Sequence, residues 1–198
     1  MMKGIKSIGF IFFLFLTACS TLAPPSSKPL PLSWKERQQT LQELRHWKLQ
    51  GAIAVRTPAD GGSANLNWQQ NGQTYSLSLF GPLGANAVQI YGKPGLVTLQ
   101  TPEGKTFSAP DAEQLLYRQL GWKLPVSNLY YWARGLPVPS LPAQKEFDQY
   151  HRLTRLTQQN WQLWFKQYAV FNHAELPTKI VLQHPQLNIK IVIYQWGS

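Results

Sequence analysis

The chain has 198 residues, which is enough for one domain of ordinary size and short for two. Eight tryptophans, eight tyrosines and nine phenylalanines exclude a disordered chain, and a single cysteine excludes a disulfide framework or a cysteine-rich zinc site. The net charge of +10 favours an anionic partner, either nucleic acid or acidic lipid headgroups.

Residues 1–18 have the pattern of a lipoprotein signal peptide. Two lysines precede an apolar run at 7–16, which is too short for a helix to span a bilayer of roughly 30 Å. The sequence Leu-Thr-Ala-Cys at 16–19 then resembles a bacterial lipobox, in which the cysteine is acylated and becomes the first residue of the mature protein. We therefore expect Cys19 to be the lipidation site; an ordinary cleaved signal with a chance cysteine is the alternative.

Residues 19–32 are expected to form a tether between the lipid and the domain. Four prolines and three serines lie within 20–32, a composition typical of extended, partly polyproline-like chain that reaches roughly 40 Å. In enteric bacteria an aspartate after the cysteine retains lipoproteins in the inner membrane, so Ser20 favours the outer membrane. Secretion argues against a nucleic-acid partner. The basic surface is then expected to face anionic lipid, with simple solubility charge as the alternative.

Residues 33–198 are predicted to form one domain that is mainly β with helices. Ser33 and Glu36 have capping-box spacing and predict a helix that runs to about His46. Asn71-Gly72 predicts a tight hairpin turn. Alternation of apolar and polar side chains predicts strands at 48–57, 64–70, 73–80, 87–91, 96–100 and 105–107.

The periodicity changes after residue 107. Helices are predicted at 111–120, with an N-cap region at 108–111, Pro110 in the first turn and a stop at Gly121, and at 126–134, with a stop at Gly135. Because strands and helices do not alternate, we expect one large antiparallel sheet curled on itself, with helices covering one end. Its interior is either filled by side chains or hollow. Strands resume at residue 145 and are predicted at 150–158, 161–168, 178–184 and 187–196.

Signals for catalysis are weak. No nucleophile elbow, phosphate-binding loop or zinc-protease motif occurs, and the four histidines lack metal-ligand spacing. Glu146 and Asp148 share a strand face as a conceivable acid pair, and Ser76 or Ser78 with a distant histidine would be needed for a hydrolase. We therefore predict no catalytic residue, no metal site and no cofactor.

One loop between two predicted strands is distinctive. Gly81 and Gly84 flank Pro82-Leu83, so Leu83 is expected at the tip of a tight turn. The side chain either folds back onto the core or enters lipid as a small wedge.

Short motifs spread over nearly the whole chain are each weak, but their order and spacing are specific. They are Leu16–Cys19, Trp34, Gly51-Ala52, Trp68-Gln69-Gln70, Tyr75–Leu79, Pro82-Leu83-Gly84, Pro94-Gly95, Asp111-Ala112-Glu113, Trp132 with Gly135-Leu136-Pro137, and Asp148-Gln149-Tyr150 with Leu153. In this order they resemble the LolB family of outer-membrane lipoprotein receptors. Residues 168–177 carry no clear motif.

The resemblance implies an incomplete, open antiparallel β-barrel with a helical lid over an apolar cavity. It implies a monomer anchored in the outer membrane and facing the periplasm, which accepts the acyl chains of triacylated lipoproteins from the periplasmic carrier LolA. The cargo is then placed in the inner leaflet of the outer membrane without ATP or metal. In the family a loop leucine is needed for insertion, and the matching residue is Leu83, flanked by Pro82 and Gly84.

The residues expected to line the cavity were chosen by strand alternation and helix face, so a slip of one residue would exchange several of them. They are Ile53, Val55, Leu66, Trp68, Tyr75, Leu77, Leu79, Val88, Ile90, Leu116 and Trp132. Three other functions remain open at this point: a lipid or glycolipid binder of similar fold, a lipoprotein hydrolase, and a structural envelope lipoprotein with a filled barrel.

Overall fold

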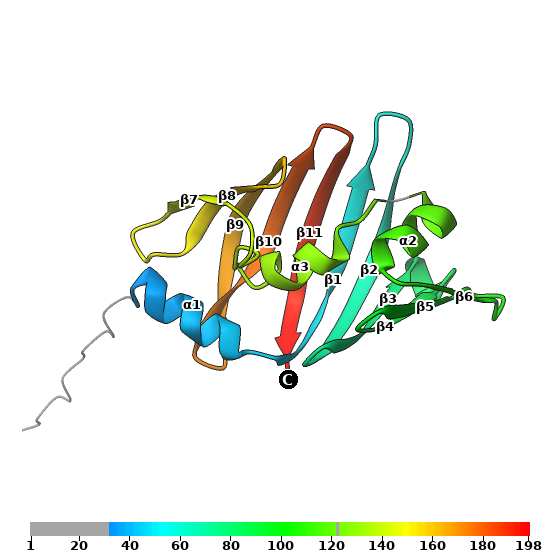
Figure 1. Ribbon diagram of the computed structural model, residues 1–198, viewed down its shortest axis with the longest axis horizontal. Coiled ribbons are helices and arrows are strands. Elements are labelled where there is room, and N and C mark those ends of the chain that lie inside the picture. The colour runs from blue at the N-terminus through cyan, green and yellow to red at the C-terminus, as the bar shows by residue number, and fades with distance from the viewer. Residues whose placement is uncertain (1–31, 122) are drawn as a thin grey trace, which may run out of the picture. The chain divides into compact units, whose positions relative to one another are not determined.

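The computed structural model describes residues 32–121 and 123–198 (Figure 1). The expected signal peptide, Cys19 and most of the expected tether lie outside the described residues. The described elements are α1 (Trp34–Glu43), β1 (His46–Arg56), β2 (Gly61–Asn71), β3 (Thr74–Phe80), a short 3-10 turn (Pro82–Gly84), β4 (Val88–Lys93), β5 (Leu96–Gln100), β6 (Thr106–Ala109), α2 (Ala112–Leu120), α3 (Val126–Trp132), β7 (Gln144–Phe147), β8 (Leu153–Gln158), β9 (Trp161–Phe171), β10 (Ala174–His184) and β11 (Leu187–Gly197).

The strands form one antiparallel sheet in the order β6-β5-β4-β3-β2-β1-β11-β10-β9-β8-β7. Strands β1 to β6 follow one another outward from the centre, and β11 back to β7 do the same on the other side. The pairing of β1 with β11 joins these two halves. Because β6 and β7 end the sheet without pairing to each other, the barrel is incomplete, as the family resemblance implied.

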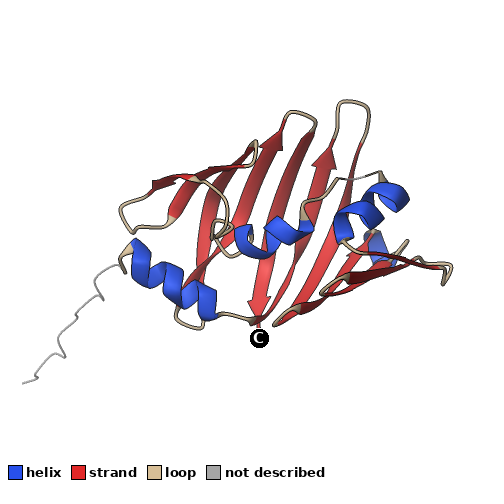
Figure 2. Cartoon of the chain, in the orientation of Figure 1, coloured by secondary structure: helices blue, strands red, loops and turns tan. Residues whose placement is uncertain are grey.

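The helices lie over one face of the sheet. In Figures 1 and 2, α1, α2 and α3 all lie on the near side of the strands. We call this side the covered face and the opposite side the open face. On β1 the side chains of Trp47, Leu49 and Val55 are buried on the covered face, whereas Lys48 and Arg56 alternate with them and are exposed. The same alternation in the other strands builds a single apolar core under the helices.

Helix α1 begins with the predicted capping box. Glu36 N donates to Ser33 Oγ at 3.3 Å, and Ser33 N donates to the Glu36 carboxylate at 2.8 Å. The hydrogen bond from the Ser33 hydroxyl lowers the pKa of Glu36. The helix ends at Glu43, so its predicted extension to His46 is wrong. His46 already pairs with Asn71 in the β1–β2 ladder, which removes it from the helix.

Helix α2 is capped at both ends. Gln114 N donates to the side chain of Asp111 at 2.8 Å, and Gly121, with φ of +72°, donates its N–H to Tyr117 O at 3.0 Å. Pro110 precedes the cap and does not enter the first turn, which corrects the expected start. Helix α3 is shorter than predicted and ends at Trp132.

Two hairpin turns differ from expectation. Asn71 pairs with Thr74 as the end of β2, so the turn residues are Gly72 and Gln73 and not Asn71-Gly72. Only Gly72 of this pair has a positive φ, of 59°.

The second turn lies within residues 168–177, where the sequence showed no motif. Strands β9 and β10 run through this segment and turn at Asn172 and His173, which both have positive φ.

Arginines hold α1 against the far half of the sheet. The buried Arg37 donates to Glu175 at 2.7 Å and to Tyr150 O at 3.1 Å, and Arg152 bridges Glu175 and Asp148. Burial alone would raise the pKa of Asp148, but hydrogen bonds from Arg152 and Tyr150 outweigh it and lower the pKa. The Glu146–Asp148 acid pair is therefore wrong, because Asp148 is paired with Arg152 and Glu146 with Arg155.

Candidate functional site

The residues expected to line a cavity all contribute to the covered side of the molecule. Ten of the eleven are buried in one contiguous core, and Tyr75 is half-buried at its edge. The strand register places Leu66 opposite Leu79 and Trp68 opposite Leu77. The ten buried residues are Ile53, Val55, Leu66, Trp68, Leu77, Leu79, Val88, Ile90, Leu116 and Trp132.

The expected cavity is open at its edge and closed in its depth. A pocket of about 830 Å³ opens between the sheet and the helices α2 and α3, and Trp68 and Tyr75 of the predicted lining form part of its wall. Where the sheet faces α3 and the segment before it, ten core side chains enclose a void of only about 10 Å³. A space of that size holds at most one water molecule. An acyl chain can therefore reach the deeper part of the predicted lining, around Leu66 and Leu77, only if the helices move away from the sheet.

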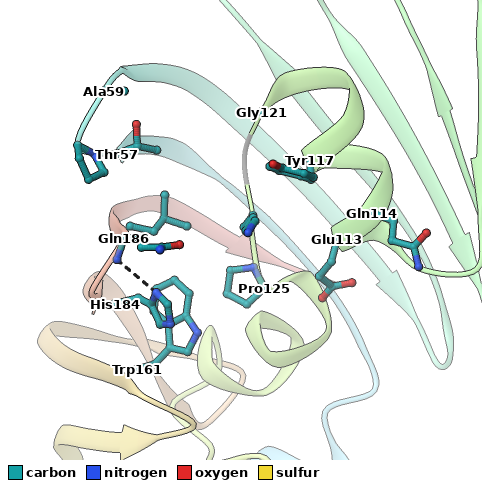
Figure 3. A pocket seen from close by; sticks show the side chains of 13 residues that line it. Thr57, Ala59, Glu113, Gln114, Tyr117, Gly121, Pro125, Trp161, His184 and Gln186 are labelled. Atoms are coloured by element: carbon teal, nitrogen blue, oxygen red, sulfur yellow. Dashed lines mark hydrogen bonds between the residues drawn. The ribbon is translucent and has the colours of Figure 1, made fainter.

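A pocket of about 770 Å³ opens beside the lid, at one end of the strands (Figure 3). Its walls come from three loops, from α2 and from the start of β9, and they are mostly apolar. Figure 3 shows Trp161 and His184 on one side of this space and Tyr117 on the other. The lining residues are Thr57, Pro58, Ala59, Glu113, Gln114, Tyr117, Gly121, Lys123, Pro125, Trp161, His184, Gln186 and Leu187.

Aromatic rings lead from this pocket into the core. The ring centroids of His184 and Trp161 lie 5.0 Å apart, and those of Trp161 and Trp132 lie 5.9 Å apart. The His184 ring is held by Gln186, whose N–H donates to Nδ1 at 3.4 Å (Figure 3). Trp132 is the last residue of α3 and is fully buried, so apolar side chains are packed without a break from the pocket into the core.

A buried glutamine fastens α3 and the segment after it to the sheet. Gln158 of β8 accepts from Trp132 Nε1 and from Val138 N, both at 3.0 Å. It donates to Val138 O at 2.9 Å and to Leu141 O at 3.1 Å. One side chain therefore satisfies four polar groups and closes the lid over this half of the core.

Arg134 fastens the same region to α1. Its guanidinium is buried and donates to Leu41 O and Leu44 O at 2.9 Å, and it stacks 4.2 Å from the Tyr130 ring centroid. Burial lowers the pKa of Arg134, because the surrounding partners are carbonyls and aromatic rings that compensate only part of the lost hydration. The carbonyls at the end of α1 still favour a cation there.

Replacing Gln158 with leucine should loosen this end of the lid. The change leaves Trp132 Nε1 and the Val138 backbone without partners in the core, so we expect the free energy of unfolding to fall by about 2–4 kcal/mol. Uptake of an apolar fluorescent probe should become faster. Urea denaturation and stopped-flow fluorescence measure the two effects. Gln183→Leu, the same substitution at an exposed position of β10, is the control and should change neither. Unchanged stability in Gln158→Leu would show that Gln158 does not hold the lid.

The loop that follows β3 presents Leu83 to solvent. The side chain is 108% exposed relative to its reference value, so the alternative in which it folds back onto the core is wrong. Gly81 N donates to Ala85 O at 2.7 Å and Ala85 N to Pro82 O at 3.1 Å, which closes the turn on itself. Leu83 has φ of 55°, a conformation that costs a residue with a Cβ roughly 1 kcal/mol. A large apolar side chain held outward in a strained turn points to a function.

This loop lies at the same end of the sheet as the pocket. Arg56 pairs with Gly61 at the β1–β2 turn, and Phe80 at the end of β3 pairs with Asn65 further along β2. Since neighbouring strands run in opposite directions, residues 57–60, 81–87 and 185–186 all leave the sheet at one end.

The serines considered for a hydrolase lie elsewhere. Ser76 and Ser78 alternate with the buried residues of β3 and face away from the lid, and Ser78 Oγ donates to Gln89. Neither His151 nor His184 is hydrogen-bonded to these serines: the His151 ring bonds to Leu32 O, and the His184 ring accepts from Gln186 N. Within residues 32–121 and 123–198 no group of three or more His, Cys, Asp or Glu is placed to hold a metal ion. No helix in these ranges is long and apolar enough to cross a membrane.

The family model for the outer membrane lipoprotein LolB matches residues 45–196. The chain belongs to the LolB family. This confirms the resemblance drawn from the motifs and the predicted outer-membrane localisation. An outer-membrane lipoprotein LolB from Nitrosococcus oceani is 40% identical over 192 residues, covering 96% of both chains. The LolB of Pseudomonas syringae is 37% identical and covers 96% of this chain and 94% of its own.

Solved structures share the fold of this LolB-family chain at low sequence identity. A LolA superfamily protein from Nitrosomonas europaea superposes with a TM-score of 0.54 at 8% identity, over 84% of this chain and 93% of its own. A DUF1329 family protein from Desulfovibrio piger gives a TM-score of 0.55 at 7% identity, over 83% and 90%. The open sheet with helices on one face is therefore an architecture shared beyond the LolB family.

Sequence reasoning missed the pocket that opens beside the lid. Tyr117, Pro125, Trp161 and Leu187 line it, yet strand alternation and helix face did not single them out. The order of the antiparallel strands could have indicated the pocket. In such a sheet every second turn leaves at the same end, which brings the loops around residues 58, 160 and 185 together.

Proposed function

We propose that this LolB-family chain accepts triacylated lipoproteins from a LolA-like periplasmic carrier and inserts them into the outer membrane. The observation that supports it best is the exposed Leu83 at the same end of the sheet as the apolar pocket. A lipid-entering residue then lies at the end of the sheet at which acyl chains would enter. The family membership agrees with this role.

The energetics of the cargo require a sheltered route. Three acyl chains of roughly fifteen carbons each would cost on the order of 35 kcal/mol if they were released into water. The chains therefore have to move from one apolar site directly to the next. The path from the pocket past Trp161 and Trp132 provides such a site once the lid moves.

The acyl chains of the cargo then enter at the pocket and come to lie between the sheet and the helices that cover it. As the helices move off, the closed core exchanges contacts between side chains for contacts with acyl chains. Leu66, Leu77 and Ile90 lie in the middle of this surface and are proposed cargo contacts. No energy source is needed at this step if affinity rises from carrier to receptor to bilayer.

The membrane anchor is proposed to be an acylated Cys19 joined to the domain by the segment 19–32. A monomer held in this way faces the periplasm and keeps its loops close to the inner leaflet of the outer membrane. The hydrogen bond between His151 Nδ1 and Leu32 O, at 3.1 Å, fixes where the tether meets the domain.

The deciding experiment mixes the purified mature protein with a complex of LolA and a lipoprotein. We expect the cargo to move to the receptor and, when vesicles are added, into lipid. Cargo that stays on LolA would contradict the proposal. Acceptance without delivery would point to a lipid binder, and turnover of ester substrates to a hydrolase.

Mass spectrometry of the mature protein should show a lipid-modified residue 19 as its first residue. The single cysteine and the lipobox motivate this expectation. A Cys19→Ala form exported by a generic secretory signal should be soluble and should still accept cargo, because the described domain begins well beyond this residue. An unmodified N-terminus at another residue would contradict the anchor.

A further inference from the structure

Charge is segregated between the two faces of the sheet. Apart from Glu175 of β10, which pairs with Arg37 of α1 on the covered side, the charged side chains that alternate with buried residues in β1–β6 and β9–β11 are all basic and lie on the open face. None of them makes an ion pair with the described residues. They are Lys48, Arg56, Lys93, Lys166, Lys179 and Lys190.

The carboxylates lie elsewhere, although the chain has nine of them. They belong to the helices and their caps, to the turns and to the β7 edge, and Glu175 faces Arg37 of α1. The other eight are Glu36, Glu43, Asp60, Glu103, Asp111, Glu113, Glu146 and Asp148. The cations of the open face therefore have no carboxylates beside them to neutralise their charge. A random distribution of charge over a soluble surface would have placed some there.

Three of the lysines lie close together in the centre. Lys179 pairs with Val192, two residues along β11 from Lys190, so these two occupy diagonal positions on neighbouring strands. Such positions are separated by about 7–8 Å. Lys166 adjoins Gln167, the partner of Lys179 on β9. Like charges at this spacing repel, and an external layer of negative charge would remove that cost.

The chemistry of this face fits lipid better than protein. Five of the six cations are lysines, which are depleted in protein–protein interfaces but suit diffuse attraction to anionic headgroups. Two tyrosines stand among them, Tyr194 at 69% and Tyr91 at 51% exposure. Tyrosine is a residue of the membrane–water interface, with an apolar ring and a polar tip. Between them the face carries neutral amides and hydroxyls.

We propose that the open face of the sheet binds the phosphate headgroups of anionic phospholipids and holds the domain on the membrane surface. Arg56 lies at the end of β1, and the loop that carries Leu83 leaves the sheet at this same end. The basic face and the loop can therefore reach one bilayer together. The face supplies long-range attraction and the loop supplies local insertion. The inference rests on the proposed function only in taking the membrane as the site of delivery.

The test uses the mature chain with Cys19→Ala, so that acylation does not mask binding. Vesicles of phosphatidylcholine are compared with vesicles containing about 30% phosphatidylglycerol. We expect binding to the anionic vesicles only, weakening as salt rises. The triple variant K166Q/K179Q/K190Q should bind them about 100-fold more weakly, since each basic residue near an anionic surface contributes about fivefold. The matched control K35Q/R45Q/K145Q loses the same charge from the opposite side and edge, and should bind like the parent.

Equal binding by the two triple variants, or binding that ignores phosphatidylglycerol, would overturn the proposal. If the open-face variant keeps vesicle binding but no longer associates with a LolA-like carrier, the face docks a protein and the proposal is also wrong. Free inorganic phosphate should not compete at millimolar concentration, which separates a surface of headgroups from a single anion site. Cargo acceptance from LolA in the parent protein tests the proposed function separately, because that step needs no vesicles.

Discussion

Replacing Leu83 with glutamate should strongly slow delivery of lipoproteins to membranes while leaving the fold and the acceptance of cargo intact. The side chain makes no use of the core, because it is fully exposed. Entering lipid is worth about 1.5–3 kcal/mol to a leucine, whereas a carboxylate is repelled by the apolar layer. We expect the rate of transfer from receptor to vesicles to fall roughly 10- to 100-fold, as measured by cargo flotation with the vesicles.

The conformation of Leu83 decides which control variants are informative. Leu83→Asn removes the apolar group but suits φ of 55°, so it should lose delivery while the free energy of unfolding stays equal or rises by up to about 1 kcal/mol. Leu83→Met keeps an apolar side chain that is not branched at Cβ and should keep delivery. A β-branched residue is unsuitable, because it would strain the turn. Losses of delivery that follow the melting temperatures of these variants would show that Leu83 does not act by entering lipid.

Gly51→Ala should be strongly destabilising for the addition of a single methyl group. An added Cβ would overlap the backbone carbonyl oxygen of Val192, so the strands themselves must shift. Gly51 lies at the irregularity where Gln50 pairs with Gln195 and Gly51 with Ile193, which leaves Tyr194 as an extra residue on β11. Because this ladder joins the two halves of the sheet, we expect a loss of roughly 3 kcal/mol in the free energy of unfolding.

The matched control is Gly197→Ala, in the same β1–β11 ladder. Its added Cβ would lie 3.7 Å from the Lys48 side chain, an ordinary contact, so stability should change by less than about 1 kcal/mol. Urea denaturation of both variants gives the comparison. Similar midpoints for the two would show that the close approach at Gly51 relaxes without cost.

The strands and their faces were predictable because the side-chain period of a strand is two. Leu66 and Trp68 alternate with Asn67 and Gln69, and the structure buries the first pair and exposes the second. The ends of elements were less predictable. The end of α1 depends on His46 pairing with Asn71, a contact between segments that local periodicity does not contain.

For the candidate site, sequence predicted the tip position of Leu83 and the side of the sheet on which the apolar residues lie. It could not predict whether the space beside them is open, because alternation identifies a face and not its occupant. The buried bonds of Gln158 and Arg134 that close the lid were also invisible, since each joins residues far apart in the chain. The pocket near Trp161 required the strand order as well.

The central pairing of β1 with β11 has a consequence for how the protein is made. The chain is translocated from its N-terminus, so β1 emerges early and its partner emerges after every other strand. Until then β1 has an unpaired edge at the centre of the future sheet, with Ile53 and Val55 uncovered. Contacts between residues so far apart in the sequence make folding slow and leave aggregation-prone, partly folded states exposed. A nascent receptor of this kind is therefore itself expected to need protection by periplasmic holdases before it can shelter the acyl chains of others.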